Sequence, residues 1–417
     1  MHLRFSTAGE SHGKAFVTIV EGLPAGLPVA ADAVDRDLAR RMQGYGRGAR
    51  MKIERDRIEW LSGVRAGETL GSPVAMLIAN RDWANWEDVM AHEAADGEPA
   101  GELRRRRVSR PRPGHADLAG VLKYDRLDAR DILERASARE TAARVAAGAL
   151  ARRLLDEFGV EVGSHVVTLG GIAAPRPEEL PVPLNDSADQ SEVRVLDRSV
   201  EPEIVRRIDE AKKAGDTLGG EVEVVARGVV VGLGSHVSWD RKLDGRLAGL
   251  LMSIPAVKGV EIGLGFEAAR RPGSQVHDAI SGAQRDGGAG GPPVAGDRRG
   301  GFRRASNNAG GLEGGITTGE PVVVRVAMKP ISTLMSPLPT VDLASGEPAS
   351  AQSERSDVTA VPALGVIAEA MVSLALADAM LEKFGGDSLG EMRRNYQAYV
   401  ASLGSRWTES RGGAGVP

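Results

Sequence analysis

Residues 141–158 read TAARVAAGALARRLLDEF, and their spacing predicts the central helix of the fold. Ala142, Val145, Ala149 and Leu150 recur at helical intervals and form a narrow face of small side chains, which favours close packing against a second helix. The helical pattern begins near residue 128, and Gly159 is a typical residue to end it. The sequence therefore predicts one long helical region over residues 128–158.

A second long run, PALGVIAEAMVSLALADAMLEKF, occupies residues 362–384. Its length would also suit a membrane span, but Glu369 and Asp378 interrupt it, and a central acidic side chain costs roughly 2.5–3.5 kcal/mol on insertion scales. We therefore interpret it as a buried helix. The two runs end in the similar segments LLDEFG and MLEKFG, which fit either an internal duplication or a chance likeness of two helix ends.

Shorter patterns surround these two helices. We expect strands at residues 14–21, 160–169, 221–231, 257–262 and 321–328, and helices at 31–43, 203–214 and 241–252. The order lacks a regular βαβ alternation, which favours an α+β fold over a doubly wound sheet. Residues 1–400 are expected to form a single large domain, with a mobile Gly-rich loop at 282–304 and a disordered tail at 401–417.

Composition narrows the classes of function. The chain has 417 residues, of which 42% are hydrophobic and 26% charged, as in a soluble globular protein. It contains no cysteine, which excludes disulfides and thiolate ligands, and we assign no metal site. The N-terminal residues show no signal-peptide pattern, so we expect a cytoplasmic protein that binds no membrane.

A nucleic-acid-binding protein is one alternative, because arginines crowd into residues 104–112. Such a protein needs a basic face and stacking aromatics, whereas this chain has a net charge of −4 and only 4% aromatic residues. We therefore expect no nucleic-acid partner. A steep dependence of binding on salt concentration would indicate the opposite.

Two short segments each present a histidine in a constrained loop. Residues 7–13 read TAGESHG, in which two glycines let the backbone approach a ligand while His12 is exposed to it. Residues 109–117 read SRPRPGHAD, in which the prolines hold Arg112 and His115 in a fixed relation. Taken alone, the segment at 7–13 would also fit an ordinary turn with a surface histidine.

Arginine-rich segments predict a site for anions. Residues 40–51, RRMQGYGRGARM, surround a Gly-rich turn with guanidinium groups, which pair with carboxylate or phosphate. A solvated basic turn is the alternative. Residues 135–141, RASARET, stand at the entrance to the Ala-rich helix, where backbone N–H groups, Ser137 and Arg139 can bind an anion.

Three later segments are NNAGGLEGG at 307–315, KPIST at 329–333 and RSDV at 355–358. Individually each would be a surface connection more often than a site. Together with the segments above, and in the same order, they resemble the motifs of the chorismate synthase family. The resemblance covers residues 7 to about 390.

The resemblance implies a fold and a reaction. The fold is α+β, with long central helices sandwiched between antiparallel β-sheets in a single large domain, assembled as a homotetramer. The reaction is a 1,4-anti elimination of phosphate and a C6 hydrogen from 5-enolpyruvylshikimate 3-phosphate, which gives chorismate. This is the last common step of the shikimate pathway to the aromatic amino acids. It is redox-neutral but requires reduced FMN, and NADPH enters only if the protein reduces its own flavin, which the sequence leaves open.

The resemblance also implies roles for particular residues. His12 and His115 are the acid–base histidines, one for the departing phosphate and one for the flavin, in an order that the sequence does not decide. Asp357 is the base that acts on the flavin N5 hydrogen, held and kept ionised by Arg355 and Ser356. The positions that hold FMN are Arg135, Ala136, Ser137, Pro255, Ala256, Gly314, Lys329, Pro330, Ile331, Ser332, Thr333 and Arg355. The positions near the substrate or NADPH are Arg41, Arg47, Arg50, Arg112 and Arg139.

A simple phosphatase is the alternative within the enzymes. It would use His12 as a nucleophile and would release phosphate without any flavin. The remaining histidines receive no catalytic role and are expected to be solvated or structural; they are His2, His92, His165, His236 and His277.

Overall fold

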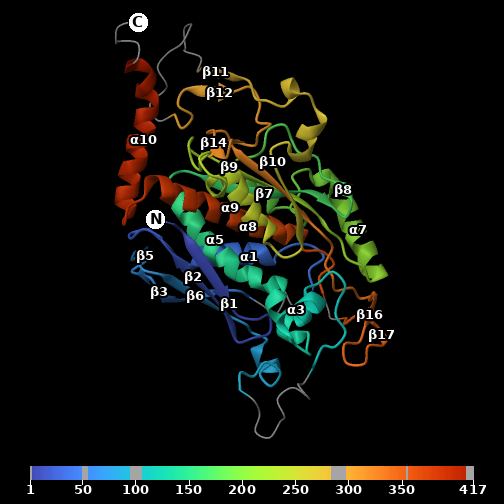
Figure 1. Ribbon diagram of the computed structural model, residues 1–417. Coiled ribbons are helices and arrows are strands. Elements are labelled where there is room, and N and C mark those ends of the chain that lie inside the picture. Colours follow the sequence, from blue (N-terminus) through green and yellow to red (C-terminus); the bar gives the residue numbers. More distant parts are fainter. Residues whose placement is uncertain (1, 49–54, 94–105, 283–296, 354–355, 410–417) are drawn as a thin grey trace.

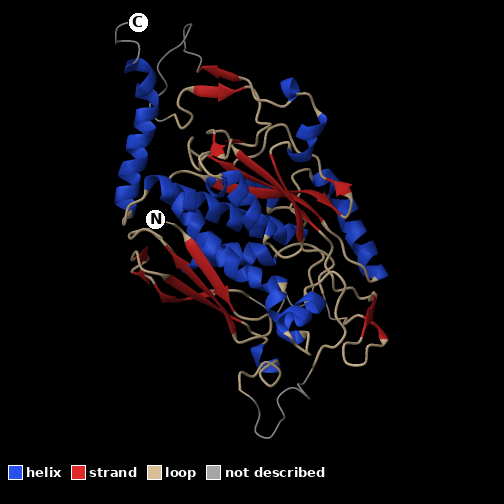
Figure 2. Cartoon of the chain, in the orientation of Figure 1, coloured by secondary structure: helices blue, strands red, loops and turns tan. Residues whose placement is uncertain are grey.

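Two antiparallel sheets and a layer of helices make up most of the chain (Figures 1 and 2). The computed structural model describes residues 2–48, 55–93, 106–282, 297–353 and 356–409. One sheet has the order β1-β2-β6-β3 and the other the order β10-β15-β9-β7-β8. The mixed helical and antiparallel architecture of the α+β prediction is therefore confirmed.

The strands of the first sheet are β1 Arg4–Ala8, β2 Ala15–Glu21, β6 Val74–Ala79 and β3 Ile58–Ser62. Those of the second are β10 Val257–Ile262, β15 Val322–Met328, β9 Gly220–Arg227, β7 Glu161–Leu169 and β8 Ile172–Ala173. Four small hairpins complete the described strands: β4 Val64–Arg65 with β5 Glu68–Thr69, β11 Ile280–Gly282 with β12 Phe302–Arg304, β13 Leu312–Glu313 with β14 Ile316–Thr317, and β16 Pro339–Val341 with β17 Pro348–Ser350.

The principal helices are α1 Ala31–Met42, α5 Thr141–Asp156, α8 Leu243–Met252 and α9 Val361–Phe384. Shorter or peripheral ones are α3 Asp117–Tyr124, α4 Arg130–Ala136, α6 Leu184–Ala188, α7 Glu201–Ala214 and α10 Leu389–Glu409. Helix α5 packs on β2 of the first sheet, α9 packs on β7 and β9 of the second, and α5 and α9 pack on each other (Figure 1).

The predicted small-residue face of α5 is buried at the contact with α9. A Cβ atom added to Gly148 would lie only 2.3 Å from the Cβ of Ala370, so glycine at this position lets the two backbones approach closely. The two helices run parallel, because the rings of Phe158 and Phe384, at their C-terminal ends, both pack on Tyr396, with centroid distances of 5.0 and 5.2 Å. Their N-termini consequently lie together at the opposite end.

Helix α9 is a core helix, as predicted. It is long and apolar enough to cross a membrane by length and composition alone, yet 94% of its most apolar window is buried within the fold. Burial would raise the pKa of Glu369, but arginines outweigh burial and lower it. The Glu369 carboxylate accepts hydrogen bonds from Arg40 at 2.9 Å, from Arg152 at 2.7 Å and from Arg194 at 3.1 Å.

Three predicted boundaries were wrong. The region 128–158 is not one helix, because Ser137 adopts an extended backbone (ψ 140°) and its hydroxyl accepts the Arg139 N–H, which separates α4 from α5. The strand predicted at 221–231 ends at Arg227, before Gly228 with its positive φ of 74°. The tail predicted to be disordered from residue 401 begins inside helix α10, which ends at Glu409.

The other predicted helices and strands are confirmed to within a few residues. Of the loop predicted to be mobile, residues 283–296 lie outside the described residues. Its last residues form β12, which pairs with β11.

Candidate active site

The predicted site segments meet where α5 and α9 begin and α1 ends. Arg41, in the last turn of α1, donates from Nε to the hydroxyl of Thr141 at the start of α5, at 2.9 Å. Gly44, with a φ of 121°, packs against Pro362 in the first turn of α9. The N-termini of two long helices therefore face the same region, and their N–H groups and dipoles favour bound anions.

His12 is held by a buried carboxylate from α4. Its Nδ1 lies 2.9 Å from Oε2 of Glu134. The same oxygen accepts a hydrogen bond from the backbone N–H of His12 at 2.9 Å. The imidazole stacks on the indole of Trp86, with ring centroids 3.8 Å apart. Burial would raise the pKa of Glu134, but the hydrogen bonds from His12 and the charge of Arg130 lower it. The carboxylate therefore stays ionised beneath the ring.

His115 is held in a similar way within its own loop. Its Nδ1 lies 2.5 Å from Oδ1 of Asp117, and Arg112 binds the same carboxylate from Nε at 2.9 Å and from Nη2 at 3.1 Å. Burial would raise the pKa of Asp117, but the hydrogen bonds from His115 and Arg112 lower it strongly. Arg112 also donates from Nη1 to the hydroxyl of Thr333 at 2.9 Å, which joins this loop to residues 329–333.

Two predicted arginines share one buried carboxylate. Arg139 binds both oxygens of Asp56 at 2.6 Å, and Nη1 of Arg41 lies 3.6 Å from Asp56. This Nη1 is buried and makes no hydrogen bond with the described residues. Burial lowers the pKa of Arg41 to about 9; Asp56 opposes this change, and the charges of Arg139 and Arg47 add to it. A hollow of about 450 Å³ beside α1 reaches Asp56.

Asn80 connects the His12 loop to this arginine group, and Arg135 holds the other end of the loop. Arg139 donates to the Asn80 side-chain oxygen at 3.2 Å, and the Asn80 amide donates to the carbonyl of Gly13 at 2.7 Å. Arg135 donates to the hydroxyl of Thr7 at 2.7 Å and to the carbonyl of Gly9 at 3.1 Å. The loop at 7–13 is thus fixed at both ends.

Asp357 lies beside the Gly-rich turn. Its Oδ1 accepts the backbone N–H of Gly48 at 2.6 Å, and its Oδ2 lies 3.3 Å from Nε of Arg47. A Cβ atom on Gly48 would come within 3.1 Å of Oδ1, so glycine permits this close approach. The described contacts of the carboxylate come from the Gly-rich turn, and of the two partners predicted from the sequence, Arg355 lies outside the described residues.

The segment at 329–333 lies between the His115 loop and the segment that carries Asp357. Lys329 donates from Nζ to the carbonyl of Gly114 at 2.6 Å and from its backbone N–H to the carbonyl of Ala256 at 3.0 Å. The hydroxyl of Thr217 donates to the Ile331 carbonyl at 2.7 Å. The next residue, Leu218, donates its backbone N–H to the carbonyl of Val358, at 2.8 Å. These bonds link the His115 group to the Asp357 group.

The remaining predicted positions are placed less directly. Gly314 lies in the turn between β13 and β14, and its neighbour Gly315 accepts the N–H of Leu243 at the start of α8. The same helix leads to Pro255 and to Ala256, which has a positive φ of 69°. Arg50 and Arg355 lie outside the described residues.

Sequence reasoning missed four residues of this site: Glu134, Trp86, Asp56 and Asn80. Each is far along the chain from the group it contacts, and none stands in a motif that signals its partner. Asp117 stood inside the segment quoted for His115, and the His-x-Asp spacing was the available signal for their contact.

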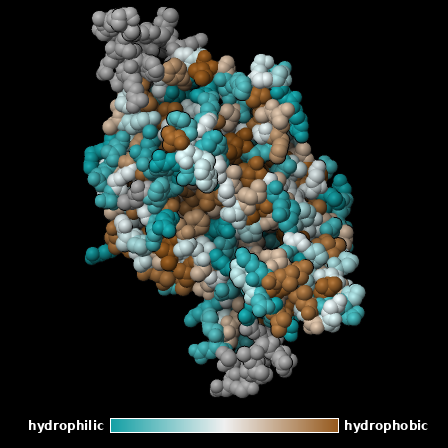
Figure 3. All heavy atoms as spheres, in the orientation of Figure 1, coloured by the Kyte–Doolittle hydropathy of each residue, from teal (hydrophilic) through white to brown (hydrophobic). Residues whose placement is uncertain are grey.

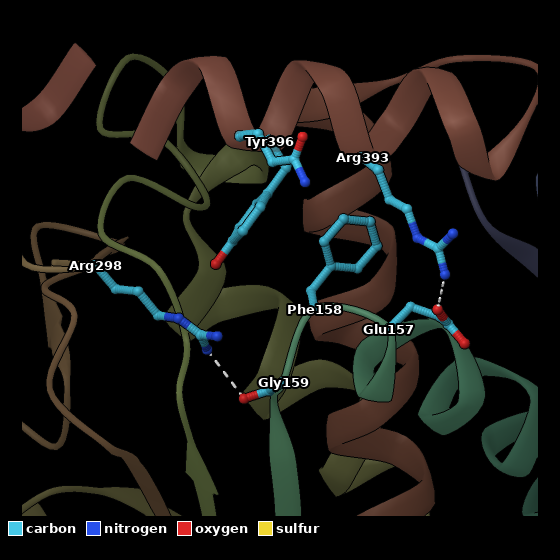
Figure 4. A pocket seen from close by; sticks show the side chains of 7 residues that line it. Glu157, Phe158, Gly159, Arg298, Arg393 and Tyr396 are labelled. Atoms are coloured by element: carbon cyan, nitrogen blue, oxygen red, sulfur yellow. Dashed lines mark hydrogen bonds and ion pairs between the residues drawn. The ribbon is translucent and has the colours of Figure 1, made fainter. Parts of the chain in front are cut away.

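A second hollow, of about 280 Å³, lies outside this site, between the end of α5 and helix α10 (Figure 4). Arg298 donates to the carbonyl of Gly159 at 2.9 Å, and Arg393 pairs with Glu157. The rings of Phe158 and Tyr396 meet edge to face across it. Both guanidinium groups are already bound to groups of this chain, so we interpret the hollow as a structural junction between α5 and α10.

The fold and the site place two carboxylate-held histidines among clustered arginines, an arrangement that suits an enzyme with an anionic ligand. The family model described as chorismate synthase matches residues 3–381, and the chain belongs to that family. Chorismate synthases are phosphate lyases of the shikimate pathway. The family assignment confirms the resemblance of the sequence segments and rules out the phosphatase interpretation.

Individual relatives agree with this assignment. The chain is 56% identical over 398 residues to the chorismate synthase of Geobacter sulfurreducens, covering 95% of this chain and 98% of that one. It is also 56% identical over 407 residues to the chorismate synthase of Streptomyces coelicolor, covering 97% and 99%. A crystal structure of a chorismate synthase matches with a TM-score of 0.75 and 43% identity, covering 97% of this chain and 99% of that one.

Proposed function

We propose that this protein forms chorismate from 5-enolpyruvylshikimate 3-phosphate with reduced FMN bound, and that His12 and His115 are its acid–base groups. The observation that carries the proposal is a pair of imidazoles, each held through Nδ1 by a buried carboxylate. The His12 loop is linked through Asn80 to Arg139, and the His115 loop carries Arg112. Both the substrate and FMN carry phosphate, and phosphate alone brings about −1.5 to −2 charges at pH 7.

The residues present fit FMN and an anionic substrate. The buried Nη1 of Arg41 makes no hydrogen bond with the described residues, and a bound anion would supply its acceptor. Burial and the charge of nearby Lys258 lower the pKa of Lys329. A bound phosphate or carboxylate would stabilise the charged form of both lysines. The segment at 329–333, Ser137 and Ala256 would hold the flavin, in keeping with the positions inferred from the sequence.

Reduced FMN, when bound, would supply the electron-rich ring that assists departure of the phosphate. The protein's own part is to bind, orient and move protons. Because Nδ1 of each histidine faces a carboxylate, Nε2 is the nitrogen directed toward a ligand, and imidazole exchanges protons near neutral pH.

Asp357 is proposed as the base. The Gly48 N–H and the Arg47 guanidinium fix its carboxylate in one orientation, at 2.6 and 3.3 Å. Arg41 lies close enough for its pKa to respond to the charges of both Arg47 and Asp357. The base and the unsatisfied arginine therefore belong to one electrostatic group, which would receive the reacting end of the substrate.

The chain is proposed to act in the cytoplasm as a homotetramer. Apolar patches interrupt the polar surface (Figure 3), and Leu122, Tyr124 and Leu127, in and just after α3, are more than 60% exposed. Exposed apolar clusters of this kind mark protein interfaces. Light scattering on the purified protein should give four times the mass of the chain, and a monomer at micromolar concentration would contradict the proposal.

Anaerobic turnover tests the function. Protein, reduced FMN and 5-enolpyruvylshikimate 3-phosphate should give chorismate, while matched reactions with no flavin or with oxidised FMN should give none. Adding NADPH to the oxidised-FMN reaction shows whether the protein reduces its own flavin. Phosphate release at an equal rate without flavin would contradict the proposal.

A further inference from the structure

We infer that Glu134 is a positioning residue for the reaction, because it sets the orientation and the protonated nitrogen of His12. This inference rests on the proposed function, in which His12 moves a proton from Nε2. Glu134 is only 1% exposed and lies on α4, whereas His12 lies in the loop between β1 and β2. The two residues are 122 positions apart, so the contact is created by the fold.

The Glu134 carboxylate contacts both the ring and the backbone N–H of His12. Nδ1 lies 3.1 Å from Oε1 and 2.9 Å from Oε2, and the His12 backbone N–H donates to Oε2 at 2.9 Å. The neighbouring residue Ser11 donates its N–H to the Glu134 carbonyl at 2.9 Å. Rotation of the imidazole would break the Nδ1 contact, and movement of the loop would break the other two.

A second layer holds Glu134 and the face of the ring. Arg130, one turn earlier on α4, donates from Nη1 to Oε1 of Glu134 at 2.8 Å. Trp86 stacks on the imidazole of His12. The guanidinium carbons of Arg106 and Arg130 lie 4.5 and 5.1 Å from the centroid of the Trp86 ring. The charged groups against His12 or its stacking partner thus include Glu134, Arg130 and Arg106.

An ionised carboxylate at Nδ1 determines which nitrogen of His12 carries a proton. It requires a proton on Nδ1, which leaves Nε2 as the nitrogen that gives or takes a proton at the ligand. The carboxylate thus fixes the tautomer and the orientation of His12, as the buried carboxylate of a catalytic triad does for its histidine.

The chain contains a matched control in a different place. Glu223 on β9 is also buried, and it also contacts both a histidine and an arginine. Its Oε1 lies 3.3 Å from Nε2 of His165 and 2.9 Å from Nε of Arg176. Burial would raise the pKa of Glu223, but the hydrogen bond from His165 lowers it, as for Glu134. His165 has no proposed role, so Glu223→Gln makes the same chemical change without touching the site.

The experiment compares Glu134→Gln with Glu223→Gln in anaerobic turnover with reduced FMN. Glu134→Gln should lower kcat roughly 10- to 10²-fold with KM changed by less than about threefold, as for loss of a residue that orients a functional histidine. A loss in kcat at a nearly constant KM distinguishes a positioning role from a loss of substrate binding. Glu223→Gln should change neither kcat nor KM.

Wild-type kcat in Glu134→Gln would overturn the inference, as would a raised KM at unchanged kcat or an equal effect in Glu223→Gln. If Glu134→Gln unfolds because Arg130 is left unpaired, the variant Glu134→Gln/Arg130→Met removes both charges and is judged by the same kcat and KM results. Absence of chorismate from the wild-type reaction would instead count against the proposed function.

Discussion

The two histidine loops reach similar geometry by different routes, and the difference shows which part of a site a sequence displays. His115 and its carboxylate, Asp117, are two residues apart in one proline-stiffened segment. His12 and Glu134 are 122 residues apart and meet only because α4 packs beside the loop at 7–13. The spacing of residues in the sequence therefore indicates the His115–Asp117 contact, whereas the His12–Glu134 contact depends on the tertiary fold.

The two carboxylates also differ in how they are held. Asp117 has two hydrogen bonds from the side chain of Arg112 and a third from its backbone N–H. Glu134 has one from Arg130, and its other partners belong to His12. We expect the His115 loop to keep its geometry by itself and the His12 loop to depend on its contacts with α4.

The largest expected effect is loss of either imidazole. His12→Ala and His115→Ala should each lower kcat roughly 10²- to 10⁴-fold, the usual range for general acid–base groups. Steady-state kinetics under anaerobic conditions, with the folded state checked by circular dichroism, measures this loss. Normal rates in both variants would show that the two rings are structural.

The next effect concerns the base rather than the histidines. Asp357→Asn keeps the shape and the Gly48 contact but removes the base, so kcat should fall roughly 10²- to 10³-fold. Binding of FMN and substrate should stay within a few-fold, because an interaction needed only in the transition state changes kcat alone. Loss of FMN binding with a normal rate in the residual complex would instead make Asp357 an anchor.

A smaller effect concerns the contribution of the Asp117 carboxylate to stability at acidic pH. The folded-state pKa of Asp117 lies below its unfolded value near 3.9, so its stabilisation is present above about pH 4 and is lost as the pH falls through the folded-state pKa. Its pH-dependent part should amount to about 2–3 kcal/mol of unfolding free energy. Urea unfolding between pH 5 and pH 3 should therefore show a shallower loss of stability in Asp117→Asn than in the wild type. Equal slopes would contradict this assignment.

The smallest effect tests the break between α4 and α5. Ser137→Ala removes the hydroxyl that accepts the Arg139 N–H and contacts Ser11, and loss of such a cap costs about 1 kcal/mol. Thermal unfolding should show a lowered midpoint. An unchanged midpoint would mean that packing alone holds the turn.

Much of the fold was predictable because periodicity is local. The spacing of Ala142, Val145 and Ala149 predicted the buried face of α5, and the run at 362–384 predicted α9 almost to the residue. The break at Ser137 was missed because a hydroxyl capping a later N–H overrides the surrounding alanine pattern. The end of strand β9 at Arg227 was missed because β-branched residues continue beyond Gly228, the residue that follows the strand.

The site was predictable only in part, for a related reason. Short motifs indicated His12, His115 and Arg41, since glycines or prolines near them constrain the backbone locally, whereas Asp357 was indicated by the family resemblance of its segment. The carboxylates that orient them are single residues, Asp56 and Glu134, that carry no motif and act across the fold. Their pairing depends on how α1, α4 and α5 pack, which no local pattern specifies.

The central claim is that both histidines serve one elimination at one site. The most direct measurement is the amount of chorismate and of phosphate released together in the anaerobic reaction with reduced FMN, for the wild type, His12→Ala and His115→Ala. We expect equal amounts in the wild type and a parallel fall of both products in each variant. Phosphate release that persists in either variant while chorismate disappears would contradict it.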